Sequence, residues 1–380
     1  MAKKWAADSR RPTARPIHTP GRAPVDVPAA PTQATSRTFP CERCDADLVF
    51  EIGAWELACP YCGFAKVIAL EDDAEIGEQD LLSTLARQAS ERSTEEEGAN
   101  EIRCASCHAT VVFRDSLTAN RCAYCGSPIQ HADAQRAEHR IAADAVLPFA
   151  IEHAVARSAV RRWLRSLWFA PRGFTRSEIP DRVASVYLPY WTFDAATFTR
   201  YAGERGSLAP RKNEVRWQSV AGTFQRLFTD VPVAADSALP RPILQGLEPW
   251  PHSGLHPYAP ELVAGHPAKT ADVSLADGWK LGRDRIEDAL RRQVKRRIGG
   301  DRQRIRTLWT RFDALTYQHI LLPVWLLTLR HGGRPYRVVV NGATGEVQGE
   351  RAWSANKIAA TVVGALAIAA AIGLAVIAGR

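Results

Sequence analysis

Cys41-Glu-Arg-Cys44 and Cys59-Pro-Tyr-Cys62 decide how the N-terminal part of this 380-residue chain folds, with residues 45–58 between the two pairs. Two Cys-x-x-Cys turns at this spacing can each present two sulfurs to one ion in a closed four-thiolate tetrahedron. Asp45 follows the first pair and Gly63 the second. Both residue types tolerate the positive φ that turns backbone amides toward the sulfurs. The sequence therefore predicts a zinc ribbon.

The same arrangement occurs a second time farther along the chain, with the same spacing inside and between its pairs, so that all eight cysteines fall into four pairs. We expect ribbons over residues 39–70 and 102–130, each holding one Zn²⁺. Closed four-cysteine sites with this spacing are overwhelmingly structural zinc. A rubredoxin-like iron site would use the same sulfurs, whereas redox dithiols would not need matched pairs. The predicted ligands are Cys41, Cys44, Cys59, Cys62, Cys104, Cys107, Cys122 and Cys125.

Composition separates the ribbons from the segments around them. Residues 1–38 are rich in proline and basic side chains, which predicts a disordered basic arm. Residues 71–101 contain eleven Asp or Glu and two Arg, which predicts an acidic linker. Residues 41–70 contain five acidic and two basic side chains, a poor surface for phosphates. The first ribbon therefore favours a protein partner.

The whole chain has a formal charge of +8, 46% hydrophobic residues and 24% charged residues. This balance excludes wholesale disorder and indicates a globular protein. Eight cysteines are too few for a disulfide-stapled secreted scaffold, and the first residues show no apolar core of a signal peptide. We expect a protein that faces the cytosol.

A transmembrane helix is predicted over residues 357–379. The stretch from Ile358 to Gly379 contains no charged side chain. As a helix it is about 33 Å long, enough to cross a hydrocarbon layer of about 30 Å. Two basic residues precede the span and one follows it, which favours a single-pass, tail-anchored protein with its bulk in the cytoplasm. Small residues at every fourth position of the span could pair two such helices in a homo-oligomer.

Residues 140–350 read as an α+β domain with two related halves. Leu188-Pro-Tyr-Trp191 and Leu322-Pro-Val-Trp325 are similar motifs, and each follows an amphipathic helical pattern. The first pattern places Trp168 on its apolar face. The second repeats Ile, Leu, Val and Ile at four-residue steps from Ile286 and stops at Gly299-Gly300. A hairpin is expected at Asn341-Gly342.

Residues 280–311 carry twelve Lys or Arg against four acidic residues. The cluster is a solvated helix face, or it contacts anionic lipid or nucleic acid. The sequence has no phosphate loop, no His-Glu-x-x-His and no Gly-x-Ser-x-Gly elbow, so no enzyme is expected. His252, His256 and His266 share a Pro-rich loop and are expected to be exposed rather than metal ligands.

Several motifs occur together with the paired ribbons: Tyr187-Leu-Pro-Tyr-Trp-Thr-Phe-Asp194, Pro257-Tyr-Ala-Pro-Glu-Leu262, Leu321-Leu-Pro-Val-Trp325 and Val340-Asn-Gly-Ala-Thr-Gly-Glu346. Over residues 40–380 the chain resembles an uncharacterised bacterial family of zinc-ribbon membrane proteins. Its members are often labelled primosomal protein N′ (replication factor Y) or superfamily II helicase-like. The resemblance implies a protein of the bacterial inner membrane.

A helicase motor needs a phosphate loop, and the nearest trace of one in this chain is Lys269-Thr270 without a Gly-rich turn. We therefore expect a membrane-anchored adaptor that recruits a protein partner through its ribbons and has no catalysis of its own. The alternative is a nucleic-acid-binding membrane protein.

Overall fold

The computed structural model describes most of the chain from residue 39 onward. The predicted basic arm, much of the acidic linker and the cysteines of the second ribbon lie outside the described residues. The described residues are 39–68, 76–90, 100–103, 110–112, 119–121, 128–130, 134–136, 141–179, 183–208 and 214–378.

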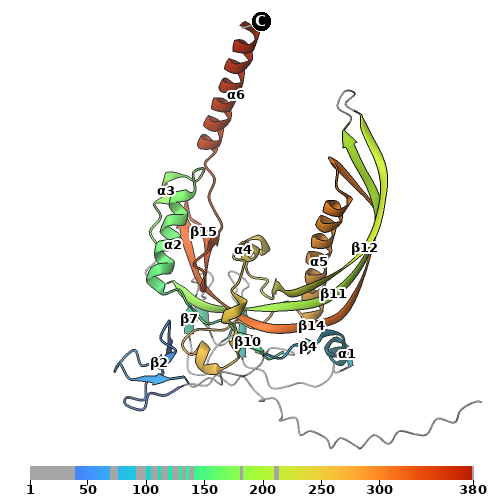
Figure 1. Ribbon diagram of the computed structural model, residues 1–380. Coiled ribbons are helices and arrows are strands. Elements are labelled where there is room, and N and C mark those ends of the chain that lie inside the picture. The colour runs from blue at the N-terminus through green and yellow to red at the C-terminus, as the bar shows by residue number, and fades with distance from the viewer. Residues whose placement is uncertain are drawn as a thin grey trace, which may run out of the picture. The chain divides into compact units, whose positions relative to one another are not determined.

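The described residues form a mixed α and β structure with six α-helices, and its main sheet has eight strands. Its order is β12-β11-β14-β10-β13, with β4 and β15 also paired to β14 and β16 paired to β15 (Figure 1). The strands of this sheet are β4 (Gln79–Asp80), β10 (Ala145–Val146), β11 (Ala184–Leu208), β12 (Val215–Ala234), β13 (His256–Pro257), β14 (Arg302–His331), β15 (Arg334–Asn341) and β16 (Val347–Gly349).

Three strands of the sheet are unusually long. β11 has 25 residues, β12 has 20 and β14 has 30, and Figure 1 shows them bending along their length. The pairing register shifts on both sides of β11 beside Asp194, and Asp230 and Ala314 adopt positive φ on the neighbouring strands at these shifts. Asp194 Oδ1 accepts the backbone N–H of Asp230 at 2.8 Å. Extra residues of this kind bend a strand and strengthen its twist, which accounts for the curvature.

The two Leu-Pro-x-Trp motifs pair with each other in the centre of the sheet. β11 and β14 are antiparallel, and Leu188 lies directly opposite Leu322. Val186 to Phe193 are all buried, whereas the following residues alternate between buried and more exposed positions. The sheet is therefore covered on both faces at the motifs and on one face farther along the strands.

Helix α5 (Leu275–Ile298) covers that second part of the sheet. It buries Ile286, Leu290, Val294 and Ile298, as the four-residue repeat predicts. Ser274 caps its N-terminus by accepting the N–H of Asp277, and Gly299 ends it with a φ of 68°. The helix also passes very close to the sheet, because a Cβ at Gly278 would lie 2.5 Å from the Trp191 ring.

Helix α2 (His153–Ser166) buries Ala156, Ala159, Val160 and Leu164 and packs against β15 and β16. The prediction that Trp168 lies on this buried face is wrong. The helix ends at Ser166, and the Trp168 side chain is 76% exposed. The predicted hairpin is confirmed as β15 and β16, whose turn is held by the buried Asn341 side chain.

The remaining helices are short or lie at the ends of the domain. Helix α6 (Ala355–Ala378) begins two residues before the predicted transmembrane span of residues 357–379. The other helices are α1 (Leu81–Ser90), α3 (Arg172–Thr175), α4 (Arg241–Gly246) and the 3-10 turns η2 (His252–Gly254) and η3 (Pro260–Val263).

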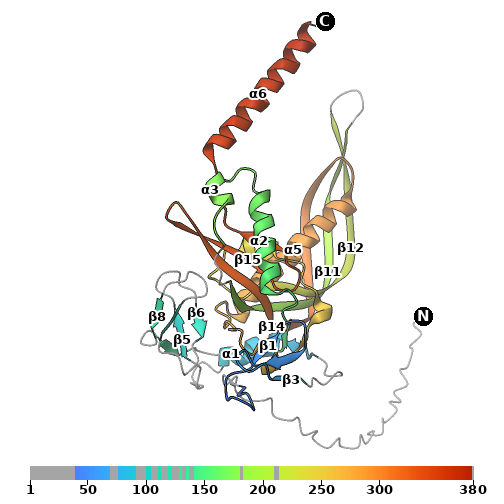
Figure 2. The ribbon, with the colours of Figure 1, turned by 90° about the vertical axis from the view of Figure 1, so that its left-hand side faces the viewer.

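Small antiparallel sheets form where both ribbons are predicted. In the first, β1 (Val49–Glu51), β2 (Glu56–Ala58) and β3 (Ala65–Val67) pair in sequence order. In the second, β5 (Asn100–Arg103) pairs with β6 (Thr110–Val112) and with β9 (Ala134–Arg136) (Figure 2). β7 (Ala119–Arg121) pairs with β8 (Pro128–Gln130). Cys104, Cys107, Cys122 and Cys125 fall in the intervals that join β5 to β6 and β7 to β8.

Candidate metal centre

The four cysteines of the first ribbon converge on one point. Their sulfur atoms all lie within 4.8 Å of one another. Cys41 Sγ is 3.5 Å from Cys62 Sγ, and Cys44 Sγ is 3.5 Å from Cys59 Sγ. A tetrahedron with metal–sulfur bonds of about 2.3 Å has sulfur–sulfur edges of about 3.8 Å. The cluster therefore matches the size of a four-thiolate metal site.

Backbone hydrogen bonds form both turns that carry these sulfurs. In the first turn, Asp45 donates its N–H to Cys41 O at 2.9 Å, and Arg43 donates its N–H to Cys41 Sγ at 3.4 Å. In the second turn, Gly63 donates its N–H to Cys59 O at 3.1 Å. Asp45 has a φ of 59° and Gly63 a φ of 70°, so the predicted positive φ is confirmed at both positions.

The thiols ionise unequally because they differ in their hydrogen bonds to backbone N–H groups and to neighbouring sulfurs. The pKa of the Cys59 thiol is lowered to about 6, mainly because its sulfur accepts the backbone N–H of Cys62. The pKa of the Cys44 thiol is raised to about 12. The backbone N–H of Ala46 lowers this pKa, but the neighbouring sulfurs of Cys59 and Cys62 raise it, and the net shift is upward. A thiolate therefore forms most readily at Cys59, and a cation between the sulfurs would favour ionisation of the other thiols.

The first ribbon packs on the α+β domain, a contact that the sequence does not reveal. Phe50 donates its N–H to Ala264 O at 3.0 Å, immediately after η3. Phe50 and Leu57, each 3% exposed, share one hydrophobic cluster with Leu262 and Val263. The ribbon core is therefore continuous with the core of the larger domain.

Two further contacts fix this packing. The Trp55 ring meets the His256 ring edge to face, with centroids 4.8 Å apart. Val49 fills the space that a side chain at Gly265 would occupy, because a Cβ there would lie 2.3 Å from Val49 Cγ1. Gly265 also has a φ of 77°, which favours glycine.

The opposite side of the ribbon faces solvent. Cys44 and Cys62 are exposed, whereas Cys41 and Cys59 are buried. Tyr61, between the ligands of the second turn, is 83% exposed, and Val67 is 76% exposed. Tyr61 lies within the second Cys-x-x-Cys turn and Val67 ends β3, so both exposed side chains belong to the ribbon. We call Tyr61 and Val67 the ribbon tip.

The histidines of the Pro-rich loop do not join a metal cluster within the described ranges. His266 is buried rather than exposed, with its Nδ1 2.8 Å from Ser185 Oγ. His256 lies against Trp55, and His252 Nδ1 is 3.8 Å from Asp230 Oδ2.

Lys269, the nearest trace of a phosphate-loop lysine in the sequence, holds a buried ion-pair network. Its Nζ is 3.0 Å from Asp236 Oδ1 and 2.7 Å from Asp272 Oδ2. The Lys269 side chain is 1% exposed and that of Asp236 is fully buried. Asp272 also accepts hydrogen bonds from Ser237. The network joins the end of β12 to the segment before α5.

Some of the basic side chains in the cluster of residues 280–311 form ion pairs within the protein. Arg285 pairs with Glu248 at 2.5 Å, and Arg283 pairs with Glu287 at 2.9 Å. Near the end of α5, four side chains line a cavity of about 650 Å³: Arg226, Gln293, Arg296 and Arg297.

α6 (Ala355–Ala378) is the one helix in the described part of the chain that is long and apolar enough to cross a membrane. Residues Ala355–Ile372 have a mean hydropathy of 1.8, and none of this window is buried. At the start of the helix, Lys357 Nζ donates to Trp168 O at 2.9 Å and to Ala170 O at 2.8 Å. These bonds tie α6 to the loop that follows α2.

Comparison with known proteins finds one similar sequence without an assigned activity. The chain is 23% identical over 336 residues to the "Uncharacterized protein YdjG" of Bacillus subtilis (strain 168). The alignment covers 85% of this chain and 92% of that protein. No family model matches the chain, and no solved structure matches it.

Proposed function

We propose that this protein is a single-pass membrane adaptor without catalysis of its own. Its ribbons, each holding one Zn²⁺, recruit a protein partner to the cytoplasmic face of a bacterial inner membrane. The observation that carries the proposal is the ribbon tip, whose two side chains are exposed on a ribbon that packs its core on the α+β domain. A contact surface held rigidly binds with a smaller loss of conformational entropy.

Zinc is the proposed ion because closed four-cysteine sites of this size are typically structural zinc. The second ion belongs to Cys104, Cys107, Cys122 and Cys125 by the repeat of the sequence. α6 is the proposed anchor, and Arg351 and Lys357 before it favour a cytoplasmic location for the domain. Pairing of two α6 helices through small residues would make the adaptor a homo-oligomer.

The α+β domain consists, in this proposal, of two related halves, α2-β11-β12 and α5-β14-β15. Support comes from the central pairing of Leu188 with Leu322. It also comes from the packing of each helix on the other half, because α2 packs on β15 and α5 packs on β12 and β11 as well as on its own β14. Packing across the halves in both directions is the arrangement expected of an intertwined internal repeat.

Site-directed photocrosslinking in native membranes tests the adaptor. A photoreactive phenylalanine replaces Tyr61 in the full chain, and in the control it replaces Val155, which is exposed on α2. We expect a discrete crosslinked protein from position 61 that is absent from position 155 and absent after Cys44→Ser. Identical crosslinks from both positions, or crosslinks that survive Cys44→Ser, would contradict recruitment by the ribbon.

The alternative function, nucleic-acid binding, is favoured by the cavity lined by Arg226, Arg296 and Arg297, because three guanidinium groups gather there. Binding of this kind weakens steeply with salt, since phosphate contacts release counterions. Titration of the full chain with a DNA oligonucleotide at low and high salt separates the two functions.

A further inference from the structure

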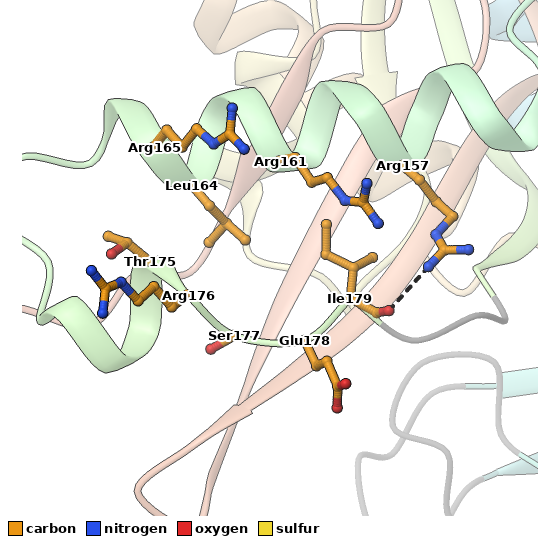
Figure 3. A pocket seen from close by; sticks show the side chains of 9 residues that line it. All are labelled: Arg157, Arg161, Leu164, Arg165, Thr175, Arg176, Ser177, Glu178 and Ile179. Atoms are coloured by element: carbon orange, nitrogen blue, oxygen red, sulfur yellow. Dashed lines mark hydrogen bonds between the residues drawn. The ribbon is translucent and has the colours of Figure 1, made fainter.

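A second basic surface lies between α2 and the residues after α3. Arg157, Arg161 and Arg165 follow one face of α2 at four-residue steps, and Arg176 comes from the turn after α3 (Figure 3). Together they border a groove of about 680 Å³. We call it the arginine groove. Its other lining residues are Leu164, Thr175, Ser177, Glu178 and Ile179.

Three arginines of the groove have no carboxylate partner in the part of the chain that the structure describes. Arg161, Arg165 and Arg176 are exposed and form no ion pair there, whereas Arg157 donates to Ile179 O at 3.3 Å. Like charges four residues apart on a helix repel each other. An anion in the groove would relieve that repulsion.

The groove ends where the candidate membrane helix begins. Lys357 of α6 bonds to the carbonyls of Trp168 and Ala170, and Ser354 donates its N–H to Phe169 O at 2.8 Å. Arg165 lies three residues before Trp168, and Arg161 lies one helical turn, about 6 Å, farther along α2.

Aromatic side chains surround this junction. Trp168 is 76% exposed and Trp353 is 55% exposed. The Phe169 ring lies 6.4 Å from the Trp353 ring, and the Arg351 guanidinium lies 4.1 Å from the Trp353 ring centroid. Exposed tryptophans beside basic residues at the start of an apolar helix are typical of the headgroup level of a bilayer. The arginine groove therefore opens next to that level.

We propose that the arginine groove binds the phosphate headgroup of an anionic phospholipid in the leaflet that α6 enters, an inference that rests on the proposed membrane anchor. Guanidinium groups bind phosphate oxygens in a bidentate manner. Thr175 and Ser177 also border the groove, but their hydroxyls donate to the carbonyls of Arg172 and Gly173, so Arg161, Arg165 and Arg176 supply the donors. No aromatic ring lines the groove among the described residues, which disfavours base stacking by nucleic acid.

Electron spin resonance on the full chain in lipid nanodiscs tests this assignment. The discs contain equal amounts of phosphatidylcholine and phosphatidylglycerol, and a spin-labelled form of each lipid reports its immobilisation by the protein. The groove variant carries Arg161→Gln, Arg165→Gln and Arg176→Gln. The control variant carries Arg291→Gln, Arg292→Gln and Lys295→Gln, the same change of charge at exposed positions of α5 that line neither pocket.

We expect the unaltered chain and the α5 control to prefer phosphatidylglycerol, and the groove variant to lose about fivefold or more of that preference, since each basic residue near an anionic surface contributes about a factor of five. The conservative variant Arg165→Lys keeps the charge but loses the bidentate geometry, so we expect an intermediate preference. This single change also shows whether a loss in the triple variant reflects misfolding.

Four results would overturn the assignment. The first is no lipid preference in the unaltered chain, and the second is an equal loss in the α5 control. The third is displacement of phosphatidylglycerol by free inorganic phosphate, which indicates a soluble ligand, and the fourth is displacement by a DNA oligonucleotide. Failure of the chain to enter the discs at all would refute the proposed anchor itself, and the headgroup site with it.

Discussion

At the scale of single residues, the four clustered cysteines lead to a prediction about the folding of the first ribbon. The ribbon is too small to bury much core of its own, so a bound structural zinc would supply about 10–16 kcal/mol, most of its stability. We predict that Cys62→Ser removes one metal ion per chain and unfolds the ribbon. Metal content by plasma mass spectrometry checks this, with Tyr61→Ser, in the same turn but not a ligand, as the control. Unchanged metal content in Cys62→Ser would refute the prediction.

The buried lysine gives a second prediction at this scale. Lys269→Met leaves Asp236 and Asp272 without their cation, and breaking a buried pair in this way costs about 3–5 kcal/mol. Lys280→Met removes a lysine from an ion pair whose side chains are 73% and 60% exposed. We expect that control to change the free energy of unfolding by less than about 1 kcal/mol. Thermal unfolding of both variants in detergent measures the difference, and equal effects would show that the network adds nothing.

The residues also show how far the sequence predicts the metal centre. Cys41, Cys44, Cys59 and Cys62 follow from spacing alone, because a four-thiolate site needs only two local turns. The role of Lys269 does not follow, because its two carboxylates come from separate segments that meet only in the folded sheet. Arg176 likewise joins the arginine groove through a turn after α3 that no local pattern places near α2.

At the scale of elements, the contact between the first ribbon and η3 depends on one glycine. Gly265→Ala adds a Cβ that would lie 2.3 Å from Val49 Cγ1 at a position with a φ of 77°. Gly333→Ala is the matched control, since Gly333 has a φ of 76° and no neighbour within 4 Å.

Both substitutions strain the backbone, by about 1–2 kcal/mol, but only Gly265→Ala adds overpacking of about 1–3 kcal/mol. We predict that Gly265→Ala separates the ribbon from the domain while its metal stays bound. Hydrogen exchange at the Phe50 amide, which is bonded to Ala264 O, measures that separation. Slow exchange at Phe50 in Gly265→Ala would contradict it, as would fast exchange in Gly333→Ala.

The helices and strands differ in how well the sequence predicts them. α5 follows from the repeat of Ile286, Leu290, Val294 and Ile298 together with the stop at Gly299-Gly300, which are local signals. The bends of the long strands do not follow, because the positive φ values of Asp230 and Ala314 lie at register shifts between β11 and its neighbours, which depend on long-range pairing. The packing of the first ribbon on η3 is also a long-range contact, and neither segment carries a sequence pattern that predicts it.

At the scale of the whole molecule, His319 makes stability depend on pH. Burial lowers its pKa below the usual 6.5, and its Nδ1 lies 2.8 Å from Ile141 O. The unfolded chain therefore binds a proton that the folded chain resists, so stability falls as pH drops through about 6.5. We predict a decline in the unfolding temperature from pH 7 toward pH 5 that is shallower in His319→Gln. Parallel curves for the two proteins would exclude His319 as the cause.

The long strands set the order in which the molecule can assemble. β11 and β12 are close in sequence and can pair early. The other edge of β11 pairs with β14, which is synthesised much later, because Leu188 and its partner Leu322 are far apart in the chain. Pairing across such separations is slow. During synthesis the β11–β12 hairpin exposes an unpaired strand edge, the kind that invites pairing with other chains. Production of this protein is therefore expected to suffer from aggregation of unfinished chains, and slower translation before β14 would aggravate it.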